Sequence, residues 1–453
     1  MTFKHETWSS STTFLLASIG AAVGLGNIWR FPYMAGTNGG GSFVLIYILA
    51  TVLIALPVLI AETMIGRRGK MSAPISMKRA ALEVKASHHW QVVGWLGVIA
   101  AFLILSFYSV IGGWVLSYIP HTLLGSIHEA NKSFVSLSFE TLLKSAWSVS
   151  LWHTVFITLT VAIVIGGIKT GLEKALRILM PALLFLLIII LTYALVAGDV
   201  QKGADFLFQI TFSKINSSVI LAAIGQAFFS IGVGIGIMFT YGAYLPEKVS
   251  LPKACCIIAF ADTSVAVIAG LAIFPIVFAN NLDPSAGPGL VFVVLPMAFN
   301  QMSGGIIIGT IFFLLLAFAA LTSAISLLEV PVAWLEEKHK WTRRGSTIAV
   351  GLGVWAVGLA SALSTNILAE FHPLWFIERF STTGILDLLD YITGQALLPL
   401  GGVLISIFVG WKMSHKTLQE ELNINSTIFK VWYFLVRFVC PTAILSVFFT
   451  AWL

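Results

Sequence analysis

The sequence carries little charge: only 10% of its 453 residues are Asp, Glu, Lys or Arg, whereas 58% are hydrophobic. Soluble globular domains average about 25% charged residues, so the composition excludes an ordinary soluble protein. Cysteine is also scarce, and Cys255, Cys256 and Cys440 lie in apolar stretches without metal-ligand spacing. We expect these three residues to be small buried side chains without a chemical role.

Long apolar runs recur along the whole chain, and each has about the 20 residues that cross a bilayer as a helix. The remaining segments, the longest being 121–150, 281–304 and 365–384, suit loop helices rather than soluble domains. The sequence therefore predicts an all-α integral membrane protein with eleven transmembrane helices. The predicted spans are 11–36, 42–66, 90–120, 151–168, 177–197, 216–243, 254–280, 305–335, 346–364, 385–411 and 428–453.

Basic residues predict the orientation of these spans. With the N-terminus in the cytoplasm, nineteen of the 26 Lys and Arg residues fall in cytoplasmic segments, five fall in outer loops, and Arg30 and Arg437 lie within spans. Cytoplasmic loops of membrane proteins carry such an excess, so we expect a multi-pass inner-membrane protein with an extracytoplasmic C-terminus. The net charge of +6 is then a topology signal and indicates no nucleic-acid partner. The first apolar run is a long helix, so we expect no cleavable signal peptide.

The first span contains an interruption between Gly20 and Pro32. Gly24, Gly26 and Asn27 weaken the helix where lipid offers no water to the backbone, and Arg30 follows at a depth where charge is costly. Such a break is tolerated where the freed N–H and C=O groups line a cavity. It predicts a small-molecule site near the middle of the membrane.

A second interruption lies in the sixth span, where Gly232, Gly234 and Gly236 alternate with apolar residues. Packing glycines are the alternative explanation, because small residues are common between membrane helices. A break repeated after five spans favours an inverted-repeat transporter. We therefore predict a first repeat over 1–200, a second over 201–413, and an additional span within 414–453. The ends of the half-helices would attract an anionic or zwitterionic solute and a cation.

Five ordered motifs resemble the neurotransmitter:sodium symporter family, and specifically its bacterial amino-acid branch. The resemblance runs from Trp8 to about the tenth span. The motifs are Gly24-Leu25-Gly26-Asn27, Trp29-Arg30-Phe31-Pro32, Asn38-Gly39-Gly40-Gly41, Gln226-Ala227-Phe228-Phe229-Ser230 and Leu321-Thr322-Ser323. The resemblance implies sodium-coupled amino-acid uptake by alternating access, in a bacterial inner membrane.

The resemblance also implies two sodium sites made of oxygen donors, the ligands that suit a hard cation. The first would use the Ala22 carbonyl, the side chains of Asn27, Ser230 and Asp262, and the substrate carboxylate. The second would use the carbonyls of Gly20, Val23 and Ala319 and the hydroxyls of Thr322 and Ser323. Taken alone, Thr322 and Ser323 would be expected to bond to carbonyls of their own helix, and the two breaks favour the ligand role instead.

Asp262 is a carboxylate within a predicted span, which marks a functional site by default. By resemblance, many animal members carry asparagine here and need chloride, while other bacterial members place a glutamate one turn later, at the position of Ala266. We therefore predict that Asp262 supplies the fixed negative charge and that transport needs no chloride. The alternative is a protonated, hydrogen-bonded aspartic acid. A second intramembrane acid, Glu62, would by resemblance hydrogen-bond the unwound backbone of the sixth span.

The substrate pocket follows from the same resemblance. Monoamine transporters carry an acidic residue at the position of Gly24, so the substrate should bring its own carboxylate to the amides of Leu25 and Gly26. Tyr108 matches the tyrosine that contacts this carboxylate, although a lone tyrosine is more often a core residue. The substrate side chain would meet Ile104, Phe229, Gly232, Ile235, Ser326 and Leu327, and Ala22, Ser230 and Ser323 complete the substrate-binding set.

Two positions in this pocket differ from many relatives. Gly232 stands where serine is common, and Ile235 stands where others have phenylalanine. Both changes enlarge the pocket, which predicts hydrophobic or aromatic L-amino acids as substrates. Extra room in an apolar pocket discriminates by only about 1–3 kcal/mol per methylene, so strict selectivity is not expected.

The outer gate would consist of Arg30 and Asp390, with Tyr108 and Phe229 beneath them. Asp387, one turn before Asp390, is a competing candidate for the acid. At the inner gate, Trp8, Tyr244 and Glu337 match the family.

The basic partner position of the inner gate holds His5, beside Lys4. A histidine there would make closure sensitive to cytoplasmic pH, and Lys4 could serve equally.

Gly171 and Pro181 lie nine residues apart at the cytoplasmic end of the fifth span. By resemblance the helix would unwind there and open a path for sodium, because glycine favours coil and proline removes a donor. An ordinary loop-to-helix start is the other interpretation.

Three other classes of function compete with the symporter. The first is a proton-coupled or sodium-independent exchanger, which would have no need of the predicted sodium ligands Asn27, Asp262 and Thr322. The second is a sensor or channel, which would bind substrate without accumulating it. An enzyme has no support, because no histidine cluster or nucleophile–base pair converges on the breaks.

Overall fold

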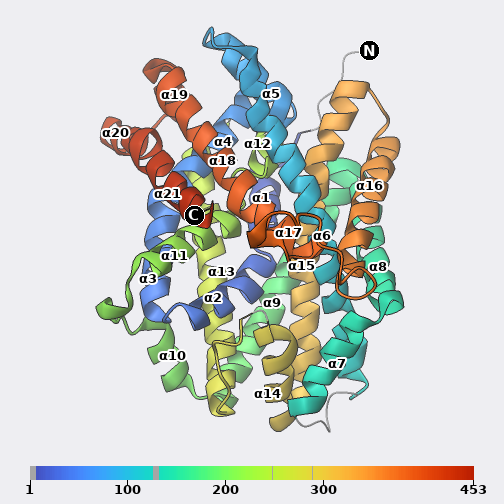
Figure 1. Cartoon of the computed structure of the whole chain (residues 1–453). Helices are drawn as coiled ribbons and strands as arrows, with labels where there is room; N and C mark the ends of the chain where they lie inside the picture. Colours follow the sequence, from blue (N-terminus) through green and yellow to red (C-terminus); the bar gives the residue numbers. More distant parts are fainter. Residues whose placement is uncertain (1–6, 126–131, 247, 288, 453) are drawn as a thin grey trace.

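The computed structural model describes residues 7–125, 132–246, 248–287 and 289–452. Within these ranges the regular elements are all helical and no strand is present, which confirms the all-α prediction (Figure 1). The α-helices are α1 (Ser11–Ala22), α2 (Phe31–Thr37), α3 (Gly41–Ala50), α4 (Leu56–Gly69), α5 (Ala73–Glu83), α6 (Gln91–Leu123), α7 (Lys132–Lys144), α8 (Ala146–Val164), α9 (Glu173–Ala197), α10 (Val200–Phe208), α11 (Ser217–Ile231), α12 (Ile237–Ala243), α13 (Leu251–Ala279), α14 (Leu295–Gln301), α15 (Gly305–His339), α16 (Arg343–Leu363), α17 (Ile385–Ile392), α18 (Leu398–Ile407), α19 (His415–Leu422), α20 (Ser426–Phe434) and α21 (Cys440–Trp452).

Nine continuous helical segments in the described part of the chain are long and apolar enough to cross a membrane, and a tenth is a pair bent by 46°. The bent pair is Ser11–Ala22 with Gly26–Thr37, at the first predicted break. The sixth predicted span, 216–243, is occupied by α11 and α12, each too short to cross alone. The count of eleven and the repeat therefore stay predictions. The nine segments are Gly41–Gly69, His88–Leu123, Ala146–Val164, Ile168–Ala197, Leu251–Ala279, Gly305–His339, Arg343–Leu363, Ile385–Lys412 and Ser426–Thr450.

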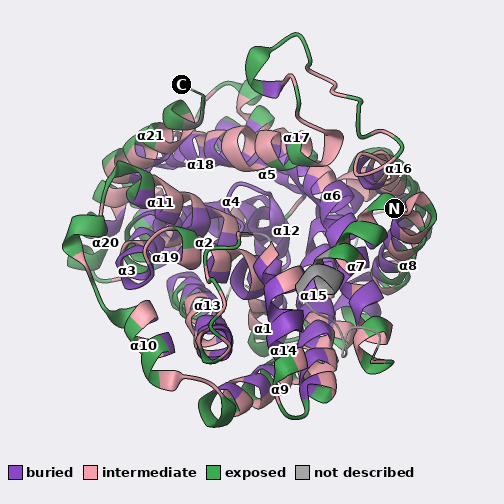
Figure 2. Ribbon diagram, turned by 60° about the horizontal axis from the view of Figure 1, so that its bottom comes forward, coloured by how far each residue is buried: buried purple, intermediate pink, exposed green. Residues whose placement is uncertain are grey.

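The helices surround a buried centre. The two longest, α6 and α15, pack along each other, α12 packs against α4, and α1 lies against α15 and α13. Figure 2 shows buried residues concentrated near the middle of the molecule and exposed residues around its edge. On the outward side of α9, the apolar residues Ile178, Phe185 and Ile188 are about 60% exposed, at 63%, 64% and 59%. Such a surface suits contact with lipid, where apolar side chains need no cover.

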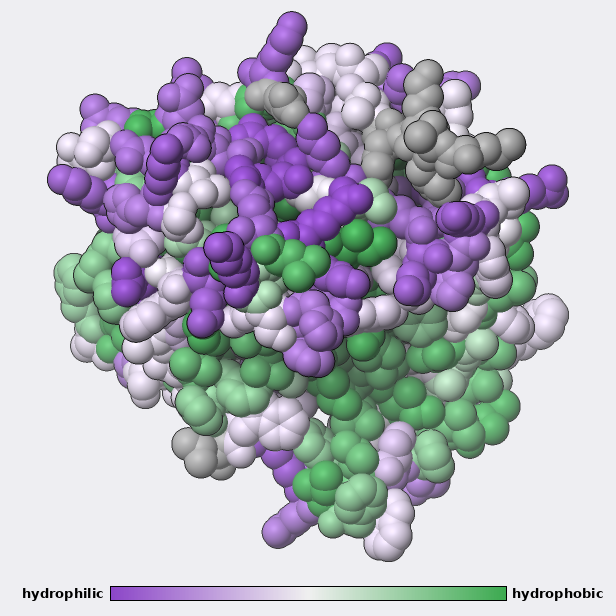
Figure 3. All heavy atoms as spheres, turned by 90° about the horizontal axis from the view of Figure 1, so that it is seen from above, coloured by the Kyte–Doolittle hydropathy of each residue, from purple (hydrophilic) through white to green (hydrophobic). Residues whose placement is uncertain are grey.

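Several short helices lie at the two ends of the molecule. Figure 1 places α5 and α19 at the end near the N-terminus, and α7, α10 and α14 at the opposite end. The loop segments 121–150 and 281–304 contain α7 and α14, as the sequence predicted. On the α5–α19 end, hydrophilic residues cover much of the surface, as Figure 3 shows from above.

Both predicted interruptions are present in the backbone. The first span leaves the helix at Val23 and Gly24 and resumes as a π-helical turn over Gly26–Arg30. In the sixth span, Gly232, Gly234 and Gly236 have φ of +71°, +84° and +84°. Residues with a β-carbon pay about 1–2 kcal/mol in this left-handed region. The backbone itself therefore requires these glycines, and helix packing is not their sole explanation.

Candidate functional site

A small cavity lies between the two breaks, and all but one of the residues predicted to bind substrate line it. Its volume is about 40 Å³, so the side chains enclose it closely. Two further residues, Ala21 and Ile237, complete the lining. The predicted residues that the cavity brings together are Ala22, Gly24, Leu25, Gly26, Ile104, Tyr108, Phe229, Ser230, Gly232, Ile235, Ser323 and Leu327.

Ser326, which the sequence placed in the substrate subsite, lies outside this lining. Its hydroxyl accepts a hydrogen bond from Tyr241 Oη at 2.7 Å and donates to the Thr322 carbonyl at 3.1 Å. The side chain is fully buried and ties α12 to α15. The structure therefore does not bring Ser326 to the cavity. Helical spacing alone does not show which face of α15 turns toward it.

The backbone of the first break is open toward Tyr108. The Leu25 amide donates to Tyr108 Oη over 3.3 Å, so the two groups predicted to hold a carboxylate already face each other. A β-carbon on Gly24 would overlap Ser323 Oγ and lie 3.1 Å from Tyr108 Oη. Glycine at position 24 therefore lets α1, α6 and α15 approach one another at the cavity.

The side chains predicted for the first sodium site meet in one buried cluster. Asn27 Nδ2 lies 2.7 Å from Asp262 Oδ1 and 3.1 Å from Ser230 Oγ, and Ser230 Oγ lies 2.9 Å from Asp262 Oδ2. The Gly24 amide donates to Asn27 Oδ1 at 3.1 Å. Asn27 and Asp262 are fully buried, and Ser230 is 3% exposed.

Tyr47 belongs to the same cluster, and sequence reasoning missed it. Its hydroxyl donates to Asp262 Oδ2 at 3.3 Å and to Ser230 Oγ at 3.4 Å. A lone tyrosine in an apolar run carries no signal that separates it from a core residue. Only the packing of α3 against α11 brings it to the carboxylate.

The residues predicted for the second sodium site lie where α1 meets α15. Thr322 Oγ1 donates to the Ala319 carbonyl at 3.0 Å, and Ser323 Oγ donates to the Ala21 carbonyl at 3.2 Å. Ser323 thus joins α15 to the end of α1, whereas Thr322 bonds within its own helix. Gly20 and Val23, whose carbonyls complete the predicted set, are buried, and Gly20 lies against Met180 of α9.

Two buried side chains connect the breaks to other parts of the molecule. Gln226 Nε2 donates to the Gly26 carbonyl at 2.9 Å and so links α11 to the first break. Glu62 Oε2 accepts a hydrogen bond from the Gly234 amide at 2.8 Å, which confirms the expected contact with the unwound sixth span. The Glu62 contact satisfies a backbone amide that the interruption leaves without a helical partner.

A larger cavity of about 270 Å³ adjoins the small one, on the side of the predicted outer gate. Arg30, Asp387 and Asp390 all line it, so the structure keeps both candidate acids near the arginine. The guanidinium carbon of Arg30 stands 4.0 Å from the centroid of the Phe229 ring. Leu25, Gly26, Tyr108 and Phe229 line both cavities. The side chains of Tyr108 and Phe229 therefore separate the two spaces.

At the opposite end, aromatic side chains close the molecule around Trp8. Its indole nitrogen donates to the Tyr241 carbonyl at 3.1 Å, and its amide donates to the Tyr244 carbonyl at 3.2 Å. The Trp8 and Tyr241 rings meet edge to face, 5.1 Å between centroids. Lys4 and His5, the two candidates for the basic gate position, lie outside the described residues.

The acid beside Tyr244 is one that sequence reasoning did not select. The Tyr244 hydroxyl donates to Glu329 Oε1 at 3.2 Å, whereas Glu337 accepts from the Ser72 amide at 2.7 Å. Glu329 is fully buried and forms a bidentate ion pair with Arg343. A glutamate inside the apolar run of the eighth span was the available signal.

The segment around Gly171 is a π-helical turn over Ile168–Leu172, followed by α9 with Pro181 inside it. Close behind the turn, Glu173 accepts hydrogen bonds from the Ser9 amide at 2.7 Å and the Ser9 hydroxyl at 2.6 Å. The start of α9 is thus tied to the chain segment that precedes α1. The predicted unwinding of this segment stays a prediction.

A family model described as the sodium:neurotransmitter symporter family matches residues 5–136 and 126–453. The chain belongs to this family. Sodium:neurotransmitter symporters are membrane transporters, so the chain is a sodium-dependent transporter and not an enzyme.

Individual members of the family resemble the chain over nearly its whole length. An uncharacterized sodium-dependent transporter of Bacillus subtilis, YhdH, is 37% identical over 98% of this chain and 97% of its own length. One from Haemophilus influenzae is 32% identical over 98% of both chains. The crystal structure of MhsT in complex with L-phenylalanine superposes with a TM-score of 0.90 and 42% identity, over 98% of this chain and 99% of that one.

Proposed function

We propose that this symporter couples sodium entry to the import of hydrophobic or aromatic L-amino acids by alternating access, without chloride. The observation that carries the proposal is the cavity between the two breaks. Its twelve predicted lining residues combine backbone amides for a carboxylate with an apolar wall. MhsT was crystallised with L-phenylalanine, an amino acid of the expected class.

Two sodium ions are proposed as co-transported cargo. The first would take oxygen atoms of Ala22, Asn27, Ser230 and Asp262, of which the last three side chains already touch. For Asn27 this requires its amide to turn, because the N–H group that now faces Asp262 cannot ligate a cation. The second would use the oxygens of Gly20, Val23, Ala319, Thr322 and Ser323 at the α1–α15 contact.

Chloride independence rests on the charge of Asp262. A carboxylate within hydrogen-bonding distance of the proposed sodium ligands balances one cation without a mobile anion. In an enclosed site this compensation matters more than in water, since the effective dielectric constant is low. Asp262 is therefore proposed to remain ionised whenever sodium is bound.

The preference for bulky side chains is proposed from the apolar lining and from Gly232 and Ile235. The cavity of about 40 Å³ is smaller than such a side chain requires, so binding must move its walls apart. We expect the Phe229 side chain to move when substrate binds, because its ring separates the small cavity from the outer one. An L-amino acid would then occupy space that these two cavities share.

Transport toward the cytoplasm follows from the proposed orientation, with the Trp8 end inside. Each sodium ion supplies ~2.3 kcal/mol per 100 mV and ~1.4 kcal/mol per tenfold gradient. Two ions thus supply roughly 7 kcal/mol, enough for about five decades of accumulation of a neutral zwitterion.

The direct test is uptake of labelled L-tyrosine and L-leucine into proteoliposomes, with an inward gradient of sodium or of potassium, in gluconate buffer. Accumulation with sodium alone supports coupling and chloride independence together. Equal uptake in potassium would instead favour a sodium-independent exchanger. Uptake that needs chloride would refute the proposed role of Asp262, and alanine as the strongest competitor would refute the proposed substrate class.

A further inference from the structure

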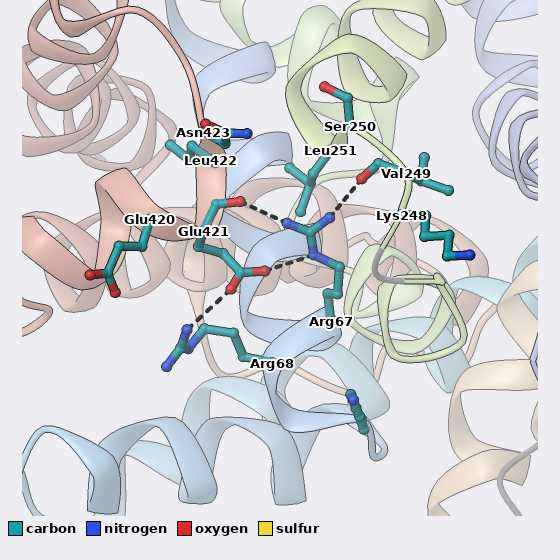
Figure 4. A pocket seen from close by; sticks show the side chains of 11 residues that line it. Arg67, Arg68, Lys248, Val249, Ser250, Leu251, Glu420, Glu421, Leu422 and Asn423 are labelled. Atoms are coloured by element: carbon teal, nitrogen blue, oxygen red, sulfur yellow. Dashed lines mark hydrogen bonds and ion pairs between the residues drawn. The ribbon is translucent and has the colours of Figure 1, made fainter.

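A fully buried histidine, His153, lies near the middle of α8 and belongs to none of the proposed binding sites. The two arginines in the cavity at the end of α4, Arg67 and Arg68, are both bound to Glu421 of α19, so their charge is compensated (Figure 4). His153 lies instead within the apolar segment Ala146–Val164, and its hydrogen bond goes to a backbone carbonyl. Ionisable side chains inside a span mark functional sites by default.

His153 and its neighbour Thr154 join α8 to α16. His153 Nε2 lies 3.2 Å from the Trp355 carbonyl, and because a carbonyl only accepts, this nitrogen carries the proton. The Trp355 indole nitrogen donates in return to Thr154 Oγ1 at 3.0 Å. The other ring nitrogen of His153, Nδ1, is buried without a hydrogen-bond partner among the described residues. The imidazole is therefore held by one hydrogen bond and by its packing.

Two glycines let the neighbouring helices close around His153. A β-carbon on Gly358 of α16 would lie 2.5 Å from His153 Cε1 and 2.6 Å from the Ser106 carbonyl of α6. A β-carbon on Gly113 of α6 would lie 2.7 Å from the His153 backbone nitrogen. A larger residue at either position would push the helices apart, so the size and position of the imidazole help to set the spacing of α6, α8 and α16.

The part of α6 that packs on His153 carries Tyr108 on its opposite face. Successive residues of an α-helix are turned by about 100°, so Ser106 and Gly113 lie roughly 150° around the axis from Tyr108. The Ser109 backbone, next to Tyr108 in the chain, also lies beside the His153 ring. One side of α6 thus lines the cavity between the breaks, and the other rests on α8 and α16.

We propose that His153 is a positioning residue that holds Tyr108 where the substrate carboxylate binds. This role rests on the proposed function, in which the Tyr108 hydroxyl and the Leu25 amide receive that carboxylate. The two groups are 3.3 Å apart, and both must reach one small anionic group. A displacement of α6 by about 1 Å is enough to disturb such an arrangement. His153 prevents this displacement by filling the space between the three helices.

The test is a double-mutant cycle on the purified full-length protein, with sodium-dependent binding of labelled L-leucine and L-tyrosine as the readout. His153→Leu removes the donor to the Trp355 carbonyl and should raise the Kd about tenfold. His153→Gln keeps an N–H donor and should stay near the wild-type Kd. Tyr108→Phe should also raise the Kd. Adding His153→Leu to Tyr108→Phe should cause little further loss, because His153 acts through the Tyr108 hydroxyl.

The rise in thermal unfolding midpoint caused by sodium alone separates positioning from general stability. None of the proposed sodium ligands lies on α6 or α8, so His153→Leu should keep this rise even where the midpoint itself is lower. The matched control is Thr160→Val. Thr160 is buried on α8 like His153, but its hydroxyl donates to the Phe156 carbonyl of its own helix at 3.0 Å, so its Kd should match the wild type.

Four outcomes would overturn the role of His153, and one of them also removes part of the proposed function. An unchanged Kd in His153→Leu, with Tyr108→Phe impaired, would exclude His153 alone. An unchanged Kd in Tyr108→Phe would remove the proposed carboxylate contact itself. Additive losses in the double variant, or an equal loss in Thr160→Val, would reduce His153 to a general packing residue. If His153→Leu does not fold, Gly358→Ala, which presses on the same ring from α16, should show the same non-additive loss.

Discussion

Asn27 and Asp262, 235 residues apart in the chain, meet in the centre of the molecule with Asn27 Nδ2 at 2.7 Å from Asp262 Oδ1. Ser230, from the last turns before the second break, bonds to the same carboxylate at 2.9 and 3.0 Å. One carboxylate thus touches side chains from both interrupted spans. A cation bound to this carboxylate would interact with both interrupted spans. Such an interaction is required to couple the binding of an ion to that of a substrate in the adjoining cavity.

If Asp262 supplies the proposed fixed charge, Asp262→Asn should make transport depend on chloride. The substitution keeps the size and hydrogen-bonding capacity of the side chain but removes its negative charge from a buried site. We expect sodium-driven uptake in gluconate to fall about tenfold or more, the effect of roughly 1.4 kcal/mol, with partial recovery in chloride. Asp387→Asn, in the outer cavity, is the control and should not create a chloride dependence.

Gly24→Ala should impair sodium binding far more than Gly26→Ala does. A β-carbon at position 24 overlaps Ser323 Oγ, whereas one at position 26 meets the Phe229 ring at 3.5 Å and the Ser230 Cα at 3.7 Å, which are ordinary contact distances. Since Ser323 belongs to the proposed second sodium site, its displacement should raise the sodium concentration for half-maximal thermal stabilisation in detergent. Similar sodium curves for both variants would show that Ser323 is not a ligand.

The interrupted spans and their glycines were predictable because local physics controls them. Backbone groups cannot be left unsatisfied in lipid, so Gly232, Gly234 and Gly236 within an apolar run signal a break before any packing is known. The cavity-lining residues could be selected because the resemblance supplied a register along each helix. That register also placed Glu62 correctly against the backbone of the second break.

The errors and omissions concern contacts that only the assembled helices create. Ser326 turns toward Tyr241 instead of the cavity, and Tyr47 reaches Asp262 from α3. Both depend on the rotation of a helix about its axis, which the sequence specifies only through the packing of all its neighbours. Glu329 was detectable as a buried charge, but its partner Arg343 lies on the next helix.

Gly234→Ala should destabilise the protein, whereas Gly225→Ala should not. Position 234 has φ of +84° and a β-carbon there would lie 2.8 Å from the Leu398 carbonyl, so we expect a loss of about 1–3 kcal/mol. Gly225 is inside α11 with nothing near its β-carbon position, and alanine should stabilise it by about 0.5–1 kcal/mol. Thermal unfolding in detergent measures both, and equal midpoints would contradict the requirement for a left-handed backbone.

Arg343→Gln should destabilise the closed inner end, because it leaves the fully buried Glu329 without its cation. Removing one partner of a buried ion pair typically costs about 3–5 kcal/mol. Tyr244, which donates to the same carboxylate, would lose a fixed acceptor, so the packing around Trp8 should loosen as well. We expect a lower unfolding temperature together with faster proteolysis of the N-terminal segment.

The control for this prediction is Arg344→Gln, which removes the same charge from an exposed neighbouring position. The double variant Glu329→Gln, Arg343→Gln should recover much of the lost stability, because no buried charge then remains unpaired. Recovery of stability without recovery of uptake would show that the Glu329–Arg343 pair has a role in transport besides its role in stability. A loss in the single variant no larger than that of Arg344→Gln would mean that Glu329 is held by its hydrogen bond to Tyr244, with Arg343 contributing little.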